Sequence, residues 1–189
     1  MSLYQSNLQL PKMDRTISAV TLSSTAKALY TSADFPALPA FFREAARKMK
    51  IHLFGKMTTG ATPGNGSFKV FYGSGADNAG TALMTGTAVA LLANQTDIPW
   101  TAELDIFCVT PGASGSLFCS GIAHFGVSLI ASTLQPILLP ASTPASVGSL
   151  DLTDITLIPS VQYLRSGSTA ETMQVLDFDV IGGSSGKWV

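Results

Sequence analysis

Hydrophobic and polar side chains alternate most regularly in residues 100–126. In the first part of this stretch every second residue is apolar: Trp100, Ala102, Leu104, Ile106 and Cys108. The residues between them point the other way and include two acids, Glu103 and Asp105. A period of two is typical of a strand with one buried face. We therefore expect a strand whose other face meets water near its start.

A run of turn-forming residues, from Thr110-Pro111-Gly112 to Gly115, interrupts the alternation, which resumes from Ser116 to Phe125. Two alternating runs joined by a short loop that contains glycine predict a β-hairpin. With the turn centred between Ala113 and Ser114, the expected pairs across the hairpin are Cys108 with Cys119, Ile106 with Gly121, and Leu104 with Ala123.

Similar patterns predict further strands on both sides of the hairpin. We expect them within residues 16–29, 49–55, 67–72, 81–92, 154–164 and 171–181. Residues 41–48 allow one or two helical turns, and residues 133–149, with three prolines, are expected to form a loop that crosses between sheets. About eight or nine strands with frequent turns and no long helix predict an all-β fold. The expected architecture is an antiparallel β-sandwich, most concretely a jelly roll.

A chain of 189 residues suits one domain with an arm. We expect an N-terminal arm with a first edge strand in residues 1–40, the β-sandwich in residues 41–181, and a flexible C-terminal tail in residues 182–189. The arm carries apolar side chains that suit a solvated tail poorly: Leu3, Tyr4, Leu8 and Leu10. We expect this arm to be mobile in the isolated protein and to dock on a partner.

Charged residues make up 12% of the chain, about half the usual share. The net charge of −1 provides no overall field for nucleic acid or an anionic membrane surface. No secretory signal and no apolar run of membrane-spanning length is recognised, so neither secretion nor a membrane span is expected. From Ile106 to Leu150 the sequence contains no Asp, Glu, Lys or Arg. Uncharged stretches of this kind indicate interfaces.

Two features have competing interpretations. The basic residues Arg43, Arg47, Lys48, Lys50 and Lys56 could bind an anion, but a solvated strand face is the favoured reading. Cys108 and Cys119 could form a bond across the hairpin, and reduced thiols are favoured because nothing indicates an oxidising compartment.

Candidate chemistry is sparse. His52 and His124 are the available imidazoles, and no nucleophile motif or phosphate-binding loop accompanies them. Asp177 with Asp179, and Asp151 with Asp154, could contribute to a calcium site, but the favoured role for the first pair is a solvated strand face. Glu103 and Asp105 could serve glycoside cleavage only within a cleft, which nothing in the sequence marks. We therefore assign no catalytic, cofactor or metal residues and do not expect an enzyme.

The hairpin resembles one found in structural proteins of tailed-phage virions. The resemblance spans about residues 50–181 at the level of pattern and is carried by Trp100, Ile106, Thr110-Pro111-Gly112, Gly115 and Gly121. It implies a jelly-roll or related β-sandwich that often trimerises and that decorates the capsid or builds tail and fibre parts. It offers no catalytic residues.

The function that this resemblance implies is a non-enzymatic capsid decoration or cement protein. Its expected partners are further copies in a homotrimer and the major capsid protein or other virion proteins, in particles assembled in the host cytoplasm. One alternative is a tail, baseplate or fibre component. Another is a carbohydrate-binding jelly-roll module, which would need exposed aromatic residues, whereas the candidates Trp100 and Tyr72 have the pattern of core residues.

Overall fold

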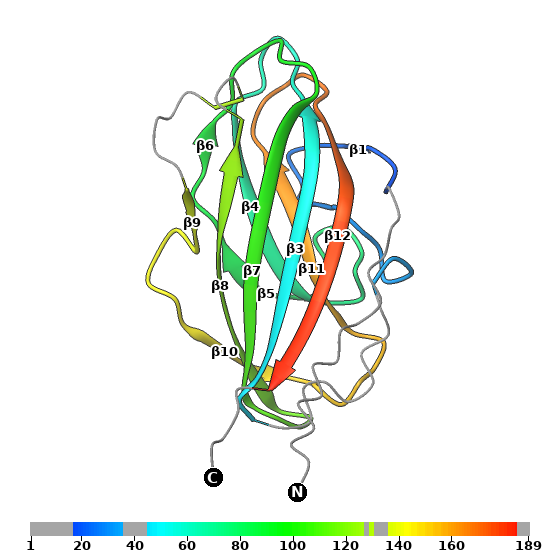
Figure 1. The fold of residues 1–189 in the computed structure, drawn as a ribbon, viewed down its shortest axis with the longest axis vertical. Helices are drawn as coiled ribbons and strands as arrows, with labels where there is room; N and C mark the ends of the chain where they lie inside the picture. The colour runs from blue at the N-terminus through cyan, green and yellow to red at the C-terminus, as the bar shows by residue number, and fades with distance from the viewer. Residues whose placement is uncertain (1–16, 36–44, 127–128, 131–135, 185–189) are drawn as a thin grey trace, which may run out of the picture.

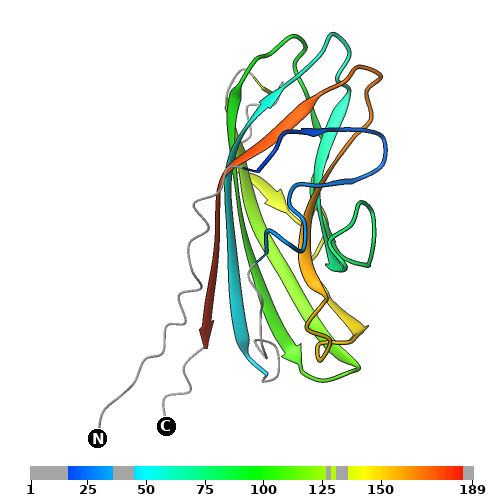
Figure 2. The same ribbon diagram turned by 90° about the vertical axis from the view of Figure 1, so that its right-hand side faces the viewer.

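Two antiparallel β-sheets pack face to face in this protein (Figures 1 and 2). The structure, a computed structural model, describes residues 17–35, 45–126, 129–130 and 136–184. Within these ranges there are twelve strands and no helix. The predicted all-β sandwich is confirmed, while the jelly-roll connectivity stays a prediction.

The larger sheet has seven strands in the order β1-β12-β3-β7-β8-β10, with β9 also paired to β8. Its strands are β1 (Val20–Thr21), β3 (Arg47–Thr58), β7 (Ile98–Thr110), β8 (Gly115–Phe125), β9 (Ile137–Leu139), β10 (Ser146–Leu150) and β12 (Thr172–Ser184). The prediction of a loop over residues 133–149 was wrong at β9 and β10, because these residues form strands. Both strands are short, with Pro136 and Pro140 directly on either side of β9, so they leave little periodic signal.

The smaller sheet has five strands in the order β2-β11-β4-β5, with β6 also paired to β4. Its strands are β2 (Lys27–Ala28), β4 (Asn65–Gly73), β5 (Thr81–Thr85), β6 (Val89–Ala90) and β11 (Ile158–Arg165). The single strand predicted within residues 16–29 is two short strands, one at an edge of each sheet. β12 continues to Ser184, so the first three residues of the predicted flexible tail, 182–184, belong to a strand; the rest of the tail lies outside the described residues.

The β7–β8 hairpin forms with the predicted faces but in a different register. Cys108 lies opposite Leu117, Ile106 opposite Cys119, and Leu104 opposite Gly121. The predicted pairs were wrong by two residues. A register shift between Cys108 and Thr110 marks a bulge in β7 next to the turn, and an extra residue on one strand displaces all the pairs beyond it.

Residues 17–35 contribute to the core between the sheets. Leu22, Leu29, Tyr30 and Phe35 are buried there, and the Tyr30 ring stacks on Phe178 of β12 with a centroid distance of 4.5 Å. The predicted boundary between arm and sandwich falls within residues 36–44, outside the described residues. The core therefore includes residues that precede that boundary.

A buried ion pair fixes residues 22–23 against the end of β11. Arg165 Nε lies 2.6 Å from Glu171 Oε2, and the two side chains are 10% and 0% exposed. The same guanidinium donates hydrogen bonds to the carbonyl of Leu22 through Nε and Nη2. Thr169 donates its hydroxyl proton to the other Glu171 oxygen at 2.6 Å. The ion pair gives each buried charge an opposite charge, while Glu171 Oε2 itself accepts no hydrogen bond.

The loop between β4 and β5 covers part of the outer face of the smaller sheet. Gln162 of β11 is fully buried beneath it. Its amide oxygen accepts the N–H of Asn78 at 2.7 Å, and its amide nitrogen donates to the Ala76 carbonyl at 2.9 Å. The outer face of the larger sheet carries more exposed side chains.

Candidate functional site

One lateral side of the sandwich contains no charged side chain over two long stretches. Neither residues 78–96 nor residues 106–150 include Asp, Glu, Lys or Arg. They supply β5 and β6 of the smaller sheet and β8, β9 and β10 of the larger one, which lie on the same side of the molecule (Figure 1). We call the described residues of these two stretches the charge-free side.

Hydrogen bonds join the two sheets along the charge-free side. The N–H of Ala141 donates to the Thr85 carbonyl at 2.9 Å, and the N–H of Leu92 donates to the Leu129 carbonyl at 2.8 Å. Large apolar side chains are exposed here: Leu138 by 65% and Leu92 by 36%. Chain segments that are distant in sequence therefore meet on the charge-free side.

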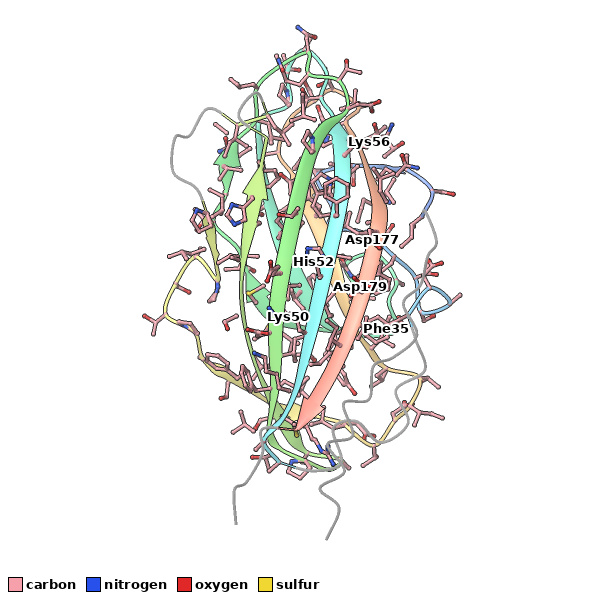
Figure 3. The ribbon with its side chains drawn as sticks, viewed as in Figure 1. Phe35, Lys50, His52, Lys56, Asp177 and Asp179 are labelled. Atoms are coloured by element: carbon pink, nitrogen blue, oxygen red, sulfur yellow. The ribbon has the colours of Figure 1, made fainter. Side chains whose placement is uncertain are left out.

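Ion pairs occupy the outer face of the larger sheet next to this side. They join β3 to β7 and to the segment before it: Lys48–Asp105 at 3.0 Å, Lys50–Glu103 at 3.0 Å and Lys56–Asp97 at 2.9 Å. Figure 3 shows Lys50, His52 and Lys56 along β3, beside Asp177 and Asp179 of β12. The three lysines of the basic run thus lie on a solvated face with acidic partners, as favoured; Arg43 lies outside the described residues.

The pairing of Lys50 with Glu103 shifts the pKa values of both residues. The hydrogen bond from Lys50, together with its charge, holds the pKa of Glu103 below its usual range. The same hydrogen bond raises the pKa of Lys50. Both shifts favour the charged forms, so this pair stays ionised at neutral pH.

A groove of about 640 Å³ lies between this face and the segment after β9. Its floor includes Glu103, Asp105 and Ser120, and its wall is formed by residues 138–144. No cleft around Glu103 and Asp105 could be predicted from the sequence, whereas the structure has a groove there. Its wall comes from residues 138–144, which are distant in the sequence. A general acid needs a raised pKa, whereas the pKa of Glu103 is lowered. The lowered pKa therefore does not fit Glu103 for the role of the acid in glycoside cleavage.

The remaining candidates for metal or acid–base chemistry are dispersed. Among the described residues, no three His, Cys, Asp or Glu side chains are grouped so that they could hold a metal ion. Asp151 accepts hydrogen bonds from the backbone and the hydroxyl of Thr153, and Asp154 accepts the same pair from Thr156. These carboxylates stabilise turns.

Both cysteines are buried free thiols. Because Cys119 lies opposite Ile106 and not opposite Cys108, the geometry proposed for a cross-strand bond does not occur. Burial raises the pKa of both thiols, that of Cys119 to about 12.

Aromatic residues on the surface differ from the two that the sequence suggested. Trp100 and Tyr72 are buried, as their pattern predicted. Phe54 of β3 is 38% exposed, and Phe107 and Phe118 form a half-buried pair across β7 and β8 with a centroid distance of 6.3 Å. Each of these phenylalanines lies between two residues that are buried. The alternation in the sequence could therefore have predicted that they lie on the outer face.

The four arm residues Leu3, Tyr4, Leu8 and Leu10 lie outside the described residues. The chain enters the described part at Ile17, whose N–H donates to the Val175 carbonyl of β12 at 3.0 Å. None of the described segments forms a helix long and apolar enough to cross a membrane.

Comparisons with known proteins add little. No protein-family model matches the chain, and no curated protein sequence matches it. Among solved structures, a legume lectin-like domain from Entamoeba histolytica is 11% identical over 95% of this chain and 91% of that chain. The TM-score of 0.30 is too low for that likeness to support an argument about this protein.

Proposed function

We propose that this chain is a non-enzymatic structural protein of a virus particle, most concretely a decoration protein that stabilises the head of a tailed phage through contacts between subunits. The observation that supports this proposal is the charge-free side. The phage setting itself comes from the resemblance of the hairpin region.

The charge-free side has the composition of an interface and not of a solvated surface. Charged residues are depleted at the centre of protein–protein interfaces, and soluble monomers rarely expose large continuous apolar patches. Leu138, which is 65% exposed, projects from the short strand β9 within this surface. Burying it against another subunit removes apolar area from water without desolvating a charge.

The proposed assembly is a homotrimer with further contacts to the major capsid protein or another virion protein. A stable interface buries about 1,600 Å² in total, and the two strand groups of the charge-free side are the natural source of this area. The number of subunits, three, is inferred from the resemblance to virion proteins. The arm, with Leu3, Tyr4, Leu8 and Leu10, is proposed to dock on a neighbouring protein, where backbone hydrogen bonds and apolar pockets supply affinity.

The outer groove favours a second candidate, a carbohydrate-binding module. Carboxylates and ammonium groups on the floor can bind sugar hydroxyls, and Leu138 and Pro140 at the wall can contact the apolar face of a ring. A glycan array would test this candidate. Binding that Glu103→Gln abolishes would favour it over a purely structural role.

The structural role is tested by co-sedimentation with virus particles that lack this protein. The wild-type chain is expected to pellet with the particles, and electron cryomicroscopy should place it on the head. A chain that stays in the supernatant under all conditions would contradict the proposal. Density at the tail would replace decoration of the head with the tail or fibre alternative.

A further inference from the structure

The floor of the outer groove combines hydrogen-bond donors and acceptors from three neighbouring strands. Lys50 Nζ of β3 lies 3.0 Å from Glu103 Oε2 of β7, and both side chains line the groove. Asp105, which lies opposite Lys50 in the register, also lines it, and Ser120 of β8 lies opposite Asp105. The floor thus offers an ammonium group, two carboxylates and a hydroxyl to a ligand.

The Lys50–Glu103 pair has capacity for further hydrogen bonds. The two side chains are 38% and 44% exposed. An ammonium group carries three protons and an ionised carboxylate accepts several hydrogen bonds, whereas the bond between the two groups uses one proton and one oxygen. The raised pKa of Lys50 and the lowered pKa of Glu103 keep both groups charged at neutral pH. A donor and an acceptor, held 3.0 Å apart, therefore face the groove together.

The wall of the groove is apolar where it faces this floor. Leu138, which is 65% exposed, lies in it together with Pro140 and Pro144. None of the described residues that line the groove is aromatic, so the apolar contact comes from these aliphatic groups. The volume of about 640 Å³ lies within the range of small-molecule sites, roughly 300–1,000 Å³.

This lining favours a neutral ligand with hydroxyl groups. One ammonium and two carboxylates disfavour an anion, and a cation would compete with Lys50 for the same carboxylates. An apolar ligand would desolvate the ion pair without replacing its hydrogen bonds to water. Each hydroxyl group can donate and accept, and two hydroxyl oxygens on neighbouring carbons of a sugar ring lie about as far apart as two hydrogen-bonded atoms. A vicinal pair of hydroxyls therefore matches the donor and the acceptor of the ion pair.

We propose that the Lys50–Glu103 pair binds two vicinal hydroxyl groups of a neutral sugar ring. Lys50 donates to one hydroxyl oxygen, Glu103 accepts the proton of the other, and Leu138 with Pro140 contacts the apolar face of the ring. Sugars that carry a carboxylate are excluded by the charge of the groove. The inference rests on the second candidate function, carbohydrate binding, and adds to it the class of sugar and the two residues that select it.

NMR titration of the isotope-labelled full chain with methyl glycosides tests this inference. The probes are methyl glucoside, methyl galactoside and methyl mannoside. Their 3-deoxy forms are the matched ligands, because they keep the ring but have no vicinal pair of hydroxyls. At least one parent glycoside should shift the amide resonances of residues 120–122 and 141–143, which line the groove. Its 3-deoxy form, and glucuronate, should bind at least roughly tenfold more weakly, because a hydrogen bond to a charged group is lost.

Two variants test the ion pair itself. Lys50→Gln and Glu103→Gln each remove one charge with little change in shape, and each should weaken binding of the parent glycoside at least roughly tenfold. Lys56→Gln is the matched control, because it breaks a similar pair, Lys56–Asp97 at 2.9 Å, whose residues do not line the groove. It should leave the affinity unchanged.

The outcomes separate this inference from the candidate function on which it rests. If the 3-deoxy forms or both groove variants bind as tightly as the parent sugar binds to the wild type, the inference is overturned, while carbohydrate binding stands as a candidate. If no glycoside binds and a glycan array is also negative, both are overturned. Tighter binding of glucuronate than of the neutral sugars would overturn the inference as well.

Discussion

Gly121 of β8 lies directly opposite Leu104 of β7, and the close approach of the two strands leaves no room for a side chain at Gly121. A methyl group there would contact the Glu103 carbonyl oxygen and would lie 2.8 Å from Leu104 Cδ2. We predict that Gly121→Ala lowers the free energy of unfolding by about 1–3 kcal/mol, the usual cost of overpacking. Urea denaturation of the purified variant measures this change.

Gly148→Ala in β10 is the matched control, because a methyl group at Gly148 has no heavy atom within 4 Å. It should change the free energy of unfolding by less than about 0.5 kcal/mol. Equal stability of the two variants would show that β7 and β8 are not as close at Gly121 as the structure has them.

Removing one charge of the buried pair Arg165–Glu171 should be costly. Glu171→Gln leaves the Arg165 guanidinium in a site that is 10% exposed, without its counter-charge. We predict a loss of about 3–5 kcal/mol in the free energy of unfolding, as found when one partner of a buried pair is removed. Thermal and urea denaturation would measure it.

Asp97→Asn is the control for that experiment, because it breaks the solvated pair Lys56–Asp97, whose side chains are 36% and 56% exposed. Its cost should be under about 1 kcal/mol. If both substitutions cost the same small amount, Arg165 and Glu171 are not buried together.

The two thiols should be unreactive in the folded protein. Cys119 is 2% exposed and its pKa is raised to about 12, so almost no thiolate forms at pH 8. A thiol-specific chromogenic reagent should therefore modify neither cysteine rapidly at pH 8 and both in denaturant. Rapid reaction of one cysteine under native conditions would contradict the burial of the hairpin's inner face.

The hairpin shows which part of a β-structure a sequence can specify. Alternation correctly placed Trp100 and Leu104 in the core, but it could not choose between registers that differ by two residues. A shift of two leaves every side chain on the same face, so the hydrophobic pattern is identical in both cases. The bulge in β7 accounts for one residue of the difference, and the turn, which places Thr110 opposite Ser116, accounts for the other.

The candidate site was only partly accessible to sequence reasoning. The uncharged run from Ile106 to Leu150 was visible at once. Its continuation through β5 and β6 became apparent only when the fold placed residues 78–96 beside it. The outer groove needs Glu103, Ser120 and Leu138 from three separate strands, and no local pattern reports such a contact.

The central claim is that the charge-free side is an interface between subunits. Leu138→Glu places a charge on it, while Ile155→Glu places the same charge at an equally exposed position outside it; the two side chains are 65% and 67% exposed. The measurement is light scattering coupled to size-exclusion chromatography at micromolar concentration. We predict a trimer for the wild type and Ile155→Glu, and a monomer for Leu138→Glu, because desolvating an unpaired charge costs several kcal/mol. A monomeric wild type, or a trimer that Leu138→Glu leaves intact, would contradict the claim.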